Sequence, residues 1–490
     1  MAIDATAVAR AVGVQGTYEP SANNSFFYLP QRIAVVGQGS TAVTYSTTKA
    51  QVTTAFEVGS TYGFGSPLHI AVRELLPNNG AGVGTIPVTV YPLDDDGSGV
   101  AAAGDITPSG AATGSASFVV KISEERSEPF TVASGDSVAT IVTAMTAAIN
   151  ANVNMQMLAT DNTTVLDLAA KWKGSSGNDL VIEVEATSED NSGITFALTQ
   201  PTGGLVNPDV DDALNQVGDV WETLFLNCME FDDTTTLGKF ATFLDARWGS
   251  LSKRPGVAFT GNTETAVATA YGTSAGRKTD RSNAYLVAPA SNNMPYQVAA
   301  AQLVDVAKVA QNNPARDYGS QTAPTITPGA DGSQWNYTQR DTAVKNGCST
   351  SIIRDNVLTM QDTVTFYHPD GDPTPAYRYV VDIVKLQQIY YQLNLEFATT
   401  KWDGAPLIPD NQATTEPTAK KPKDAKAAVF KVIDRLALKA IISDPDAAKA
   451  TVTATINSGN PKRLDIVFNV ALSGNANIID VPFTFSFFFG

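Results

Sequence analysis

The stretch of sequence that decides the fold runs from residue 342 to residue 397, and its main part, residues 357–397, reads VLTMQDTVTFYHPDGDPTPAYRYVVDIVKLQQIYYQLNLEF. Apolar and polar residues alternate in its first part, which predicts a half-buried strand. The turn formers HPDGDP follow at residues 368–373. Apolar residues then recur at steps of three and four, which predicts a helix of about five turns with one buried face. The apolar positions are Leu358, Met360, Val364 and Phe366 in the strand and Ile383, Leu386, Tyr390, Leu393 and Phe397 in the helix. This pattern predicts a helix packed on a sheet and is not typical of a catalytic site.

Three segments in this stretch resemble a known family. Residues 346–350 read NGCST, the predicted strand leads to Tyr367, and residues 377–385 read YRYVVDIVK. In this order the segments resemble the C-terminal domain of contractile-tail sheath proteins, in particular the sheaths of Mu-like bacteriophages. The resemblance continues to the C-terminus and, more loosely, back to about Gln31. It consists of similar segments in the same order and includes no single diagnostic motif.

The resemblance implies a structural polymer that has no catalytic, cofactor-binding or metal-binding residues. Such subunits form six-fold rings stacked as a helical sleeve around an inner tube, and the sleeve shortens to drive the tube through a bacterial envelope. The implied partners are other copies of the chain, the inner tail tube protein, and the baseplate and tail terminator proteins. Neither nucleic acid binding nor membrane insertion is implied. The implied location is a virion tail assembled in the cytoplasm of a host bacterium.

Composition agrees with this class of protein. A chain of 490 residues is long enough for two to four domains. Its 33 basic and 49 acidic residues give a net charge of -16, which argues against a nucleic-acid-binding protein. Only 17% of the residues are charged, which suits large, closely packed contacts. Cys228 and Cys348 lie far apart without a motif, which argues against a disulfide framework. No signal peptide and no apolar run of about 18 residues is found, which predicts assembly in a cytoplasm.

The order of predicted elements gives an α/β and α+β multidomain chain. Strands and helices alternate over two separate regions, which predicts one α/β layer domain. Short strands separated by Gly, Ser and Asn lie between these regions and predict an inserted, peripheral β-rich domain. An α+β polymerisation domain and extended arms at both termini complete the chain. The predicted boundaries are 1–30 for the N-terminal arm, 31–104 and 205–335 for the α/β domain, 105–204 for the insertion, 336–473 for the C-terminal domain and 474–490 for the C-terminal arm.

One alternative is a nucleotide-binding enzyme. Residues 37–42 read GQGSTA and fit the pattern G-x-G-x-x-A, and Glu57 follows twenty residues after the first glycine. The pattern requires a helix directly after the glycines, but residues 41–45 read TAVTY and favour no helix. A tight turn at the exit of a strand accounts for the glycines equally well.

A second alternative is a hydrolase. Residues 272–276 read GTSAG and match the nucleophile elbow G-x-S-x-G, which requires a strand before the serine and a helix after it. Here the order is reversed, because a helix is predicted over 264–271 and a strand over 284–287. Only His368 follows as a possible base, and with His69 it completes the histidines of the chain, so no histidine pair is available for zinc. A third alternative, a surface-binding adhesin, rests on the β-rich insertion alone.

The first candidate assembly surface is a basic helix predicted over residues 426–442. Residues 420–439 contain seven basic and two acidic side chains, a net charge of +5 in a chain of -16. A solvated helix face is one interpretation. The other is a face opposite the inner tube, where attraction between unlike charges holds the register and still permits sliding. The predicted tube-facing residues are Lys426, Lys431, Arg435 and Lys439.

The second candidate assembly surface is the C-terminal tail. Apolar side chains alternate with other residues along it, as in a strand with one buried face. These residues are Ile479, Val481, Phe483, Phe485, Phe487 and Phe489. Burying six such side chains contributes on the order of 10 kcal/mol, so the tail requires a partner. The tail either completes a sheet of its own domain or adds to a sheet of a neighbouring subunit. Residues 474–477 predict a flexible joint, which favours the neighbour, and the resemblance implies the same arrangement.

Overall fold

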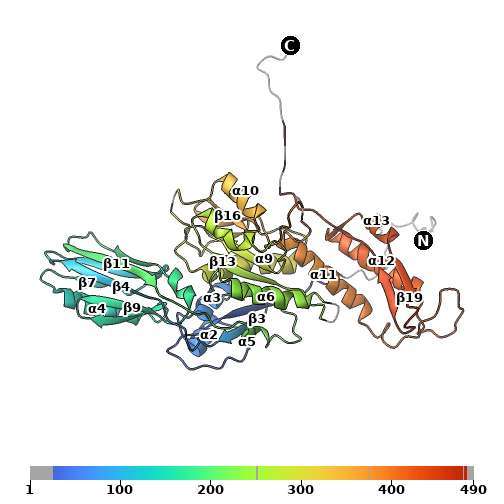
Figure 1. The fold of residues 1–490 in the computed structure, drawn as a ribbon, viewed down its shortest axis with the longest axis horizontal. Helices are drawn as coiled ribbons and strands as arrows, with labels where there is room; N and C mark the ends of the chain where they lie inside the picture. Colours follow the sequence, from blue (N-terminus) through green and yellow to red (C-terminus); the bar gives the residue numbers. More distant parts are fainter. Residues whose placement is uncertain are drawn as a thin grey trace, which may run out of the picture. The chain divides into compact units, whose positions relative to one another are not determined.

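The computed structural model describes residues 26–249, 252–330, 332–372, 375–477, 479, 481 and 482 (Figure 1). The chain forms two compact units. The main unit comprises residues 28–391 and 474–490, and the small unit comprises residues 1–27 and 392–473. The mixed α/β multidomain class predicted from the sequence is confirmed.

A six-stranded sheet forms the centre of the main unit, with the order β14-β13-β12-β1-β3-β2. The pairs β14–β13, β13–β12, β12–β1 and β1–β3 are parallel, and β2 is antiparallel to β3. Apart from β2, its strands are buried along their whole length, as expected for a parallel sheet covered on both faces. The strands are β1 (Ile33–Gln38), β2 (Ala50–Val52), β3 (Val88–Leu93), β12 (Leu224–Asn227), β13 (Val257–Asn262) and β14 (Asn283–Val287).

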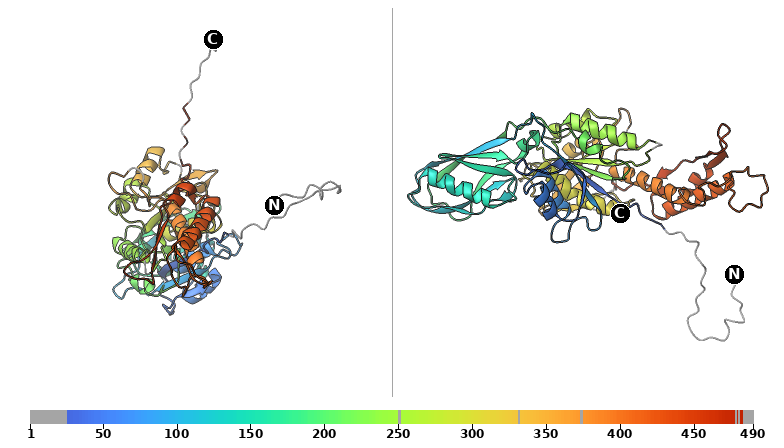
Figure 2. Two further views of the ribbon diagram at one scale, coloured as in Figure 1. Left: turned by 90° about the vertical axis from the view of Figure 1, so that its right-hand side faces the viewer. Right: turned by 90° about the horizontal axis from the view of Figure 1, so that it is seen from below.

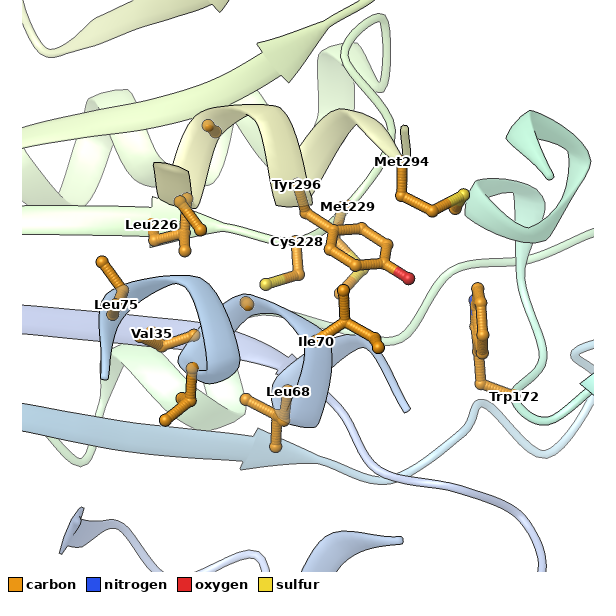
Figure 3. Packing of buried hydrophobic residues seen from close by; sticks show 14 of the residues in the cluster. Val35, Leu68, Ile70, Leu75, Trp172, Leu226, Cys228, Met229, Met294 and Tyr296 are labelled. Carbon is orange, nitrogen blue, oxygen red and sulfur yellow. The ribbon is translucent and has the colours of Figure 1, made fainter. Parts of the chain in front are cut away.

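Helices cover both faces of this sheet. Helices α3 (Pro67–Leu75) and α9 (Pro295–Asn312) pack against each other and against β1 and β13 on one face. Phe225 of β12 contacts Phe240 of α6 (Thr234–Arg247), with 6.4 Å between the ring centroids, whereas its neighbour Leu226 lies on the side of α3 and α9 (Figure 3). Shorter helices complete the layers: α2 (Ala55–Tyr62), α5 (Asp211–Leu214), α7 (Val267–Ala270) and α8 (Gly272–Ala275).

The start of α3 shows how local sequence positions these elements. The Ser66 side chain accepts a hydrogen bond from the backbone N–H of His69, and Pro67 occupies the first turn, where its missing N–H costs nothing. The helix ends at Leu75, two residues before Pro77. The cap, the proline and the end of this helix are as predicted from the sequence.

The inserted segment begins and ends at one place. Val100 and Leu205 exchange backbone hydrogen bonds of 2.9 and 3.1 Å, so the two connections to the sheet lie side by side. Between them lie two antiparallel sheets, one with the order β10-β5-β6 and β7 beside β5, the other with the order β11-β4-β9-β8. Helix α4 packs against β7, β8 and β9 (Figures 1 and 2). The elements are β4 (Ala103–Gly110), β5 (Ala116–Ile122), β6 (Glu125–Arg126), β7 (Phe130–Val132), α4 (Val138–Ala151), β8 (Met157–Asn162), β9 (Val165–Ala170), the 3-10 turn η1 (Ser175–Asp179), β10 (Ile182–Ala186) and β11 (Ile194–Thr202).

Strand β4 corrects the predicted start of the insertion. The boundary predicted between residues 104 and 105 falls inside β4, a strand of sequence AGDITPSG that pairs with both β9 and β11. Its glycines, proline and aspartate disfavour a strand locally. Pairing on both edges overrides that preference, because it satisfies the backbone of β4 on both sides.

The insertion shares a hydrophobic core with the α/β sheet and its helices. Trp172 is fully buried, and its indole ring lies against Tyr296 of α9 with 6.3 Å between the ring centroids (Figure 3). The indole N–H donates to the Ser176 hydroxyl at 2.9 Å, so this buried polar group is satisfied. Ile70 of α3 and Met294 line the same region (Figure 3). The base of the insertion is therefore packed into the body of the main unit.

An acidic side chain lies at this junction. Asp179 ends the turn η1 near Glu230, Asp232 and Glu264, which follow the carboxyl ends of β12 and β13. Protein atoms surround most of its carboxyl group, and this desolvation, together with the three neighbouring carboxylates, raises the pKa of Asp179 to about 8. The folded chain therefore binds a proton at Asp179 that the unfolded chain has released.

The pKa of Asp179 predicts how stability depends on pH. Because this pKa is raised from 3.8 in the folded state, stability is expected to fall as pH rises from about 4 to about 8. Replacing Asp179 by Asn is expected to flatten this decline, by at most about 1.4 kcal/mol per pH unit. Urea unfolding at pH 5 and pH 8 measures the effect, with Glu189→Gln, an exposed position of the insertion, as the control. Equal pH dependence in Asp179→Asn and the unaltered chain would refute the assignment.

Residues 314–391 belong to the main unit, which corrects the predicted start of a separate domain at residue 336. The ring centroids of Phe366 and Tyr285, a residue of β14, lie 4.6 Å apart. Thr365 forms an isolated antiparallel β-bridge with Ala284 of the same strand. This aromatic contact and backbone pairing attach the region to the α/β sheet. The elements here are β15 (Thr322–Ala323), α10 (Tyr337–Lys345), β16 (Thr350–Arg354), β17 (Val357–Asp362) and α11 (Val380–Phe397).

Helix α11 was predicted correctly as a helix, but its most buried face was not. Leu386, Tyr390, Leu393 and Phe397 are only half-buried, and the buried side chains include the polar residues Lys385, Gln387, Gln388 and Gln392. Gln387 donates to the carbonyls of Thr223 and Pro255, which precede β12 and β13, at 3.3 and 3.1 Å. Gln388 accepts from the backbone N–H of Leu29, and Gln392 donates to the carbonyl of Phe27. These bonds to backbone groups are a need that hydrophobic periodicity does not reveal.

The small unit is built around α12 (Pro422–Leu438). Three of the four side chains that the spacing places on its buried face, Val429, Ile433 and Leu436, are buried, whereas the fourth, Ala440, is exposed beyond the end of the helix. The other buried side chains are Ala425, Ala428 and Val432. A two-stranded sheet, β19 (Thr453–Ile456) with β20 (Leu464–Val467), packs against this helix. The remaining elements are β18 (Ile442–Ser443), α13 (Pro445–Ala450) and β21 (Ala471–Leu472).

Candidate assembly surfaces

The turn at residues 37–42, which matches a dinucleotide-binding motif, forms hydrogen bonds with the insertion. No helix follows directly after Gly39, where the dinucleotide motif requires one. The backbone N–H of Thr41 instead donates to the carbonyl of Lys171 at 2.7 Å. The Gln38 side chain donates to the carbonyl of Lys173 at 2.7 Å. A Cβ at residue 39 would lie 2.8 Å from the carbonyl oxygen of Tyr62, so packing against the chain itself requires this glycine. The insertion thus covers the strand end where an α/β fold usually binds its ligand.

The serine of the G-x-S-x-G match is also internal. Ser274 lies in the short helix α8, directly after α7, and is fully buried. Its hydroxyl lies 3.0 Å from the carbonyl of Tyr271 and 2.8 Å from that of Asn346. The predicted setting, with a helix before the serine, is confirmed. In the described part of the chain, no group of three or more acidic, His or Cys side chains could hold a metal ion, and none of its helices combines the length and apolarity needed to cross a bilayer.

The predicted tube-facing residues differ in their surroundings. Lys431 and Lys439 are exposed, and the Lys439 ammonium lies 5.7 Å from the ring centroid of Phe26. Lys426 is half-buried, 5.7 Å from the ring centroid of Phe430. Arg435 instead forms a largely buried ion pair with Glu396 at 3.2 Å. The exposed positive charge of this face therefore comes mainly from lysines, including Lys423 at the start of α12.

The described residues of the C-terminal tail expose large apolar side chains. Ile479 and Val481 are 80% and 70% exposed, and residues 479, 481 and 482 lie in no strand. The predicted strand residues Phe483, Phe485, Phe487 and Phe489 lie outside the described residues, as do residues 1–25 of the predicted N-terminal arm.

Comparison with known proteins identifies one related sequence of assigned function. No family model matches the chain. The tail sheath protein of the Mu-like prophage FluMu of Haemophilus influenzae is 24% identical over 420 residues, which are 83% of each chain.

Solved structures of sheath proteins align with most of this chain, but with low TM-scores and low sequence identity. The sheath tail protein of Listeria innocua has a TM-score of 0.48 and 12% identity, over 92% of this chain and 93% of that chain. The contracted helical sheath of the anti-feeding prophage has a TM-score of 0.47 and 11% identity, over 97% and 99%. Because these scores are low, the relationship rests on the sequence relative. The resemblance first seen at residues 346–385 is confirmed by that relative, and the chain is a homologue of a Mu-like prophage tail sheath protein.

Proposed function

We propose that the chain is the subunit of a contractile tail sheath, which assembles as stacked six-fold rings around an inner tube and shortens to drive that tube through a bacterial envelope. The name of the Haemophilus influenzae relative supports the sheath assignment. The observation that carries the proposal is the exposure of Ile479 and Val481 at the start of an alternating apolar tail. An isolated subunit gains nothing from apolar side chains left in water, whereas a polymer buries them.

The tail acts in this proposal as a strand donated to a neighbouring subunit. Backbone hydrogen bonds supply affinity in such strand addition, and alternate side chains supply specificity. The acceptor is the two-stranded sheet β19–β20 of the small unit, because a sheet of two strands is marginally stable alone and has two open edges. Val467 of β20 is 62% exposed and provides apolar surface at this sheet.

Rearranged packing between subunits supplies the work of contraction in this proposal. The two motifs that suggested an enzyme are used for contacts inside the subunit: residues 38–41 with the insertion, and Ser274 with two backbone carbonyls. Sheath subunits that pass from a metastable to a more stable lattice need no hydrolysis step.

Electron microscopy of the purified full chain tests the function. Helical rods or stacked rings in negative stain are the expected result. Discrete small particles at high protein concentration would contradict a sheath and favour the alternatives of an enzyme or an adhesin.

The basic face of α12 gives a separate prediction about the inner tube. Reversing two exposed charges, Lys423→Glu with Lys431→Glu, is expected to impair assembly on purified tube and to leave tube-free polymerisation intact. Arg435 is unsuitable for this test, because reversing it would also break its ion pair with Glu396. Lys462→Glu, an exposed change elsewhere in the small unit, is the control. Cosedimentation of sheath with tube measures the effect, and normal cosedimentation of the double variant would refute a tube-facing role.

A further inference from the structure

The chain returns to the main unit just before the tail. Residues 392–473 belong to the small unit, and residue 474 begins a segment assigned to the main unit. The sequence of this joint, Gly474 to Asn477, predicts flexibility, since small and polar residues leave it little to bury. Its contacts with the main unit show a fixed attachment instead.

Asn475 makes the principal contacts of the joint. Its side-chain oxygen accepts a hydrogen bond from the Lys385 ammonium at 2.8 Å, and its side-chain nitrogen donates to the carbonyl of Ala315 at 2.9 Å. Its own carbonyl accepts from the backbone N–H of Asn477 at 3.0 Å. The Asn477 side chain lies beside Tyr379. Two segments of the main unit, the loop at Ala315 and residues 379–385, therefore hold Asn475 and Asn477 of the joint.

Lys385 makes this attachment more than a surface contact. The side chain is fully buried in α11, and its ammonium also pairs with Asp382 at 3.1 Å. A buried ammonium is costly unless it is surrounded by acceptors. Asn475 provides one of these acceptors, so releasing the joint removes a hydrogen bond from a charge that water does not reach. Hydrogen bonds to charged groups are about twice as strong as those between neutral groups.

We propose that Lys385 and Asn475 form an anchor that fixes the C-terminal tail to the main unit. Both are positioning residues, since they hold the root of the tail and leave its apolar positions free for a partner. Tension on the tail then reaches Lys385, in the part of α11 that belongs to the main unit, without first passing along residues 398–473. This mechanical consequence rests on the proposed function, in which the tail connects neighbouring subunits, whereas the anchor itself does not.

Hydrogen exchange on the full-length subunit tests the anchor without any polymer. Asn475→Ala retains the Lys385–Asp382 ion pair and removes both side-chain bonds of Asn475. The amide of Asn477 is expected to exchange on the order of tenfold faster, since a charge-assisted bond that holds the joint is lost. Ala476→Ser, an exposed change one residue away, is the control and should exchange like the unaltered chain. Unchanged exchange at Asn477 in Asn475→Ala would overturn the anchor.

A second variant separates the anchor from general destabilisation. Tyr379→Phe removes only the contact with Asn477 and is expected to accelerate exchange at the joint by a smaller factor, with the Tm unchanged. If amides throughout the main unit exchange faster in Asn475→Ala by the same factor as the amide of Asn477, the change is general destabilisation and the anchor is wrong.

Rods made from the same variants test the mechanical consequence. Asn475→Ala rods are expected to dissociate several-fold faster after dilution than rods of the unaltered chain. Equal dissociation rates would overturn the transfer of tension through Lys385. If the unaltered chain forms no rods at all, the proposed function fails, while the exchange result still decides on the anchor.

Discussion

Removal of residues 478–490 is expected to give a folded subunit that forms no rods. The cut takes away the alternating apolar tail, whose burial contributes on the order of 10 kcal/mol to assembly. It leaves Asn475 and Asn477 in place, so Lys385 retains its buried partner and the main unit keeps its stability. A cut after Ser473 would confuse the two effects, because it would also remove Asn475. Circular dichroism and electron microscopy of the same sample separate folding from assembly.

Point variants sharpen the truncation experiment. Phe485→Asp introduces a charge on the predicted apolar face and is expected to abolish rods as the truncation does. Ser486→Thr changes the opposite face and is the matched control, expected to form rods normally. Rods of normal length from the truncated chain would show that the tail is not the connector between subunits.

Replacing Trp172 by Ala is expected to lower the free energy of unfolding of the main unit by about 3–5 kcal/mol. The indole is fully buried between the insertion and Tyr296, so its loss leaves a cavity at the junction and frees the Ser176 hydroxyl. The amides of β8 and β9, the two strands of the hairpin that precedes Trp172, are expected to exchange faster, because the insertion then opens more often. Chemical denaturation measures the stability and hydrogen exchange locates the change.

The matched control for Trp172 is Leu158→Ala in β8. Leu158 belongs to the same insertion but is 54% exposed, so its loss is expected to change stability by no more than about 0.5 kcal/mol. Similar effects of the two substitutions would contradict a shared core and support an insertion attached only by its two connections at Val100 and Leu205.

Elements with a strong local signal were predicted correctly. Helix α3 follows from its serine cap and proline, and α12 follows from apolar side chains at steps of three and four. In each case the determining interactions join residues within a few positions of each other, so they are readable along the chain.

Contacts between distant residues account for what was missed. Strand β4 forms because β9 and β11 flank it, in spite of its glycines and proline. The buried side of α11 includes Gln387 because this side chain donates to backbone carbonyls that precede two strands. Apolar periodicity predicts burial only where the partner surface is apolar, and here the partner is backbone.

For the candidate sites, too, some features could be predicted from the sequence and others required the structure. Sequence was sufficient for the resemblance to tail sheath proteins, the apolar alternation of the tail and the net positive charge of residues 420–439, since these can be read along the chain. It could not show that Arg435 is paired with Glu396, that the insertion covers the Gly37–Gly39 turn, or that Lys385 holds Asn475 ninety residues later. Each of these contacts joins residues that are far apart in the sequence and have no pattern in common. The partner of a buried charge or of a strand end is the group that the folded chain brings within hydrogen-bonding distance, and the sequence alone does not show which group that is.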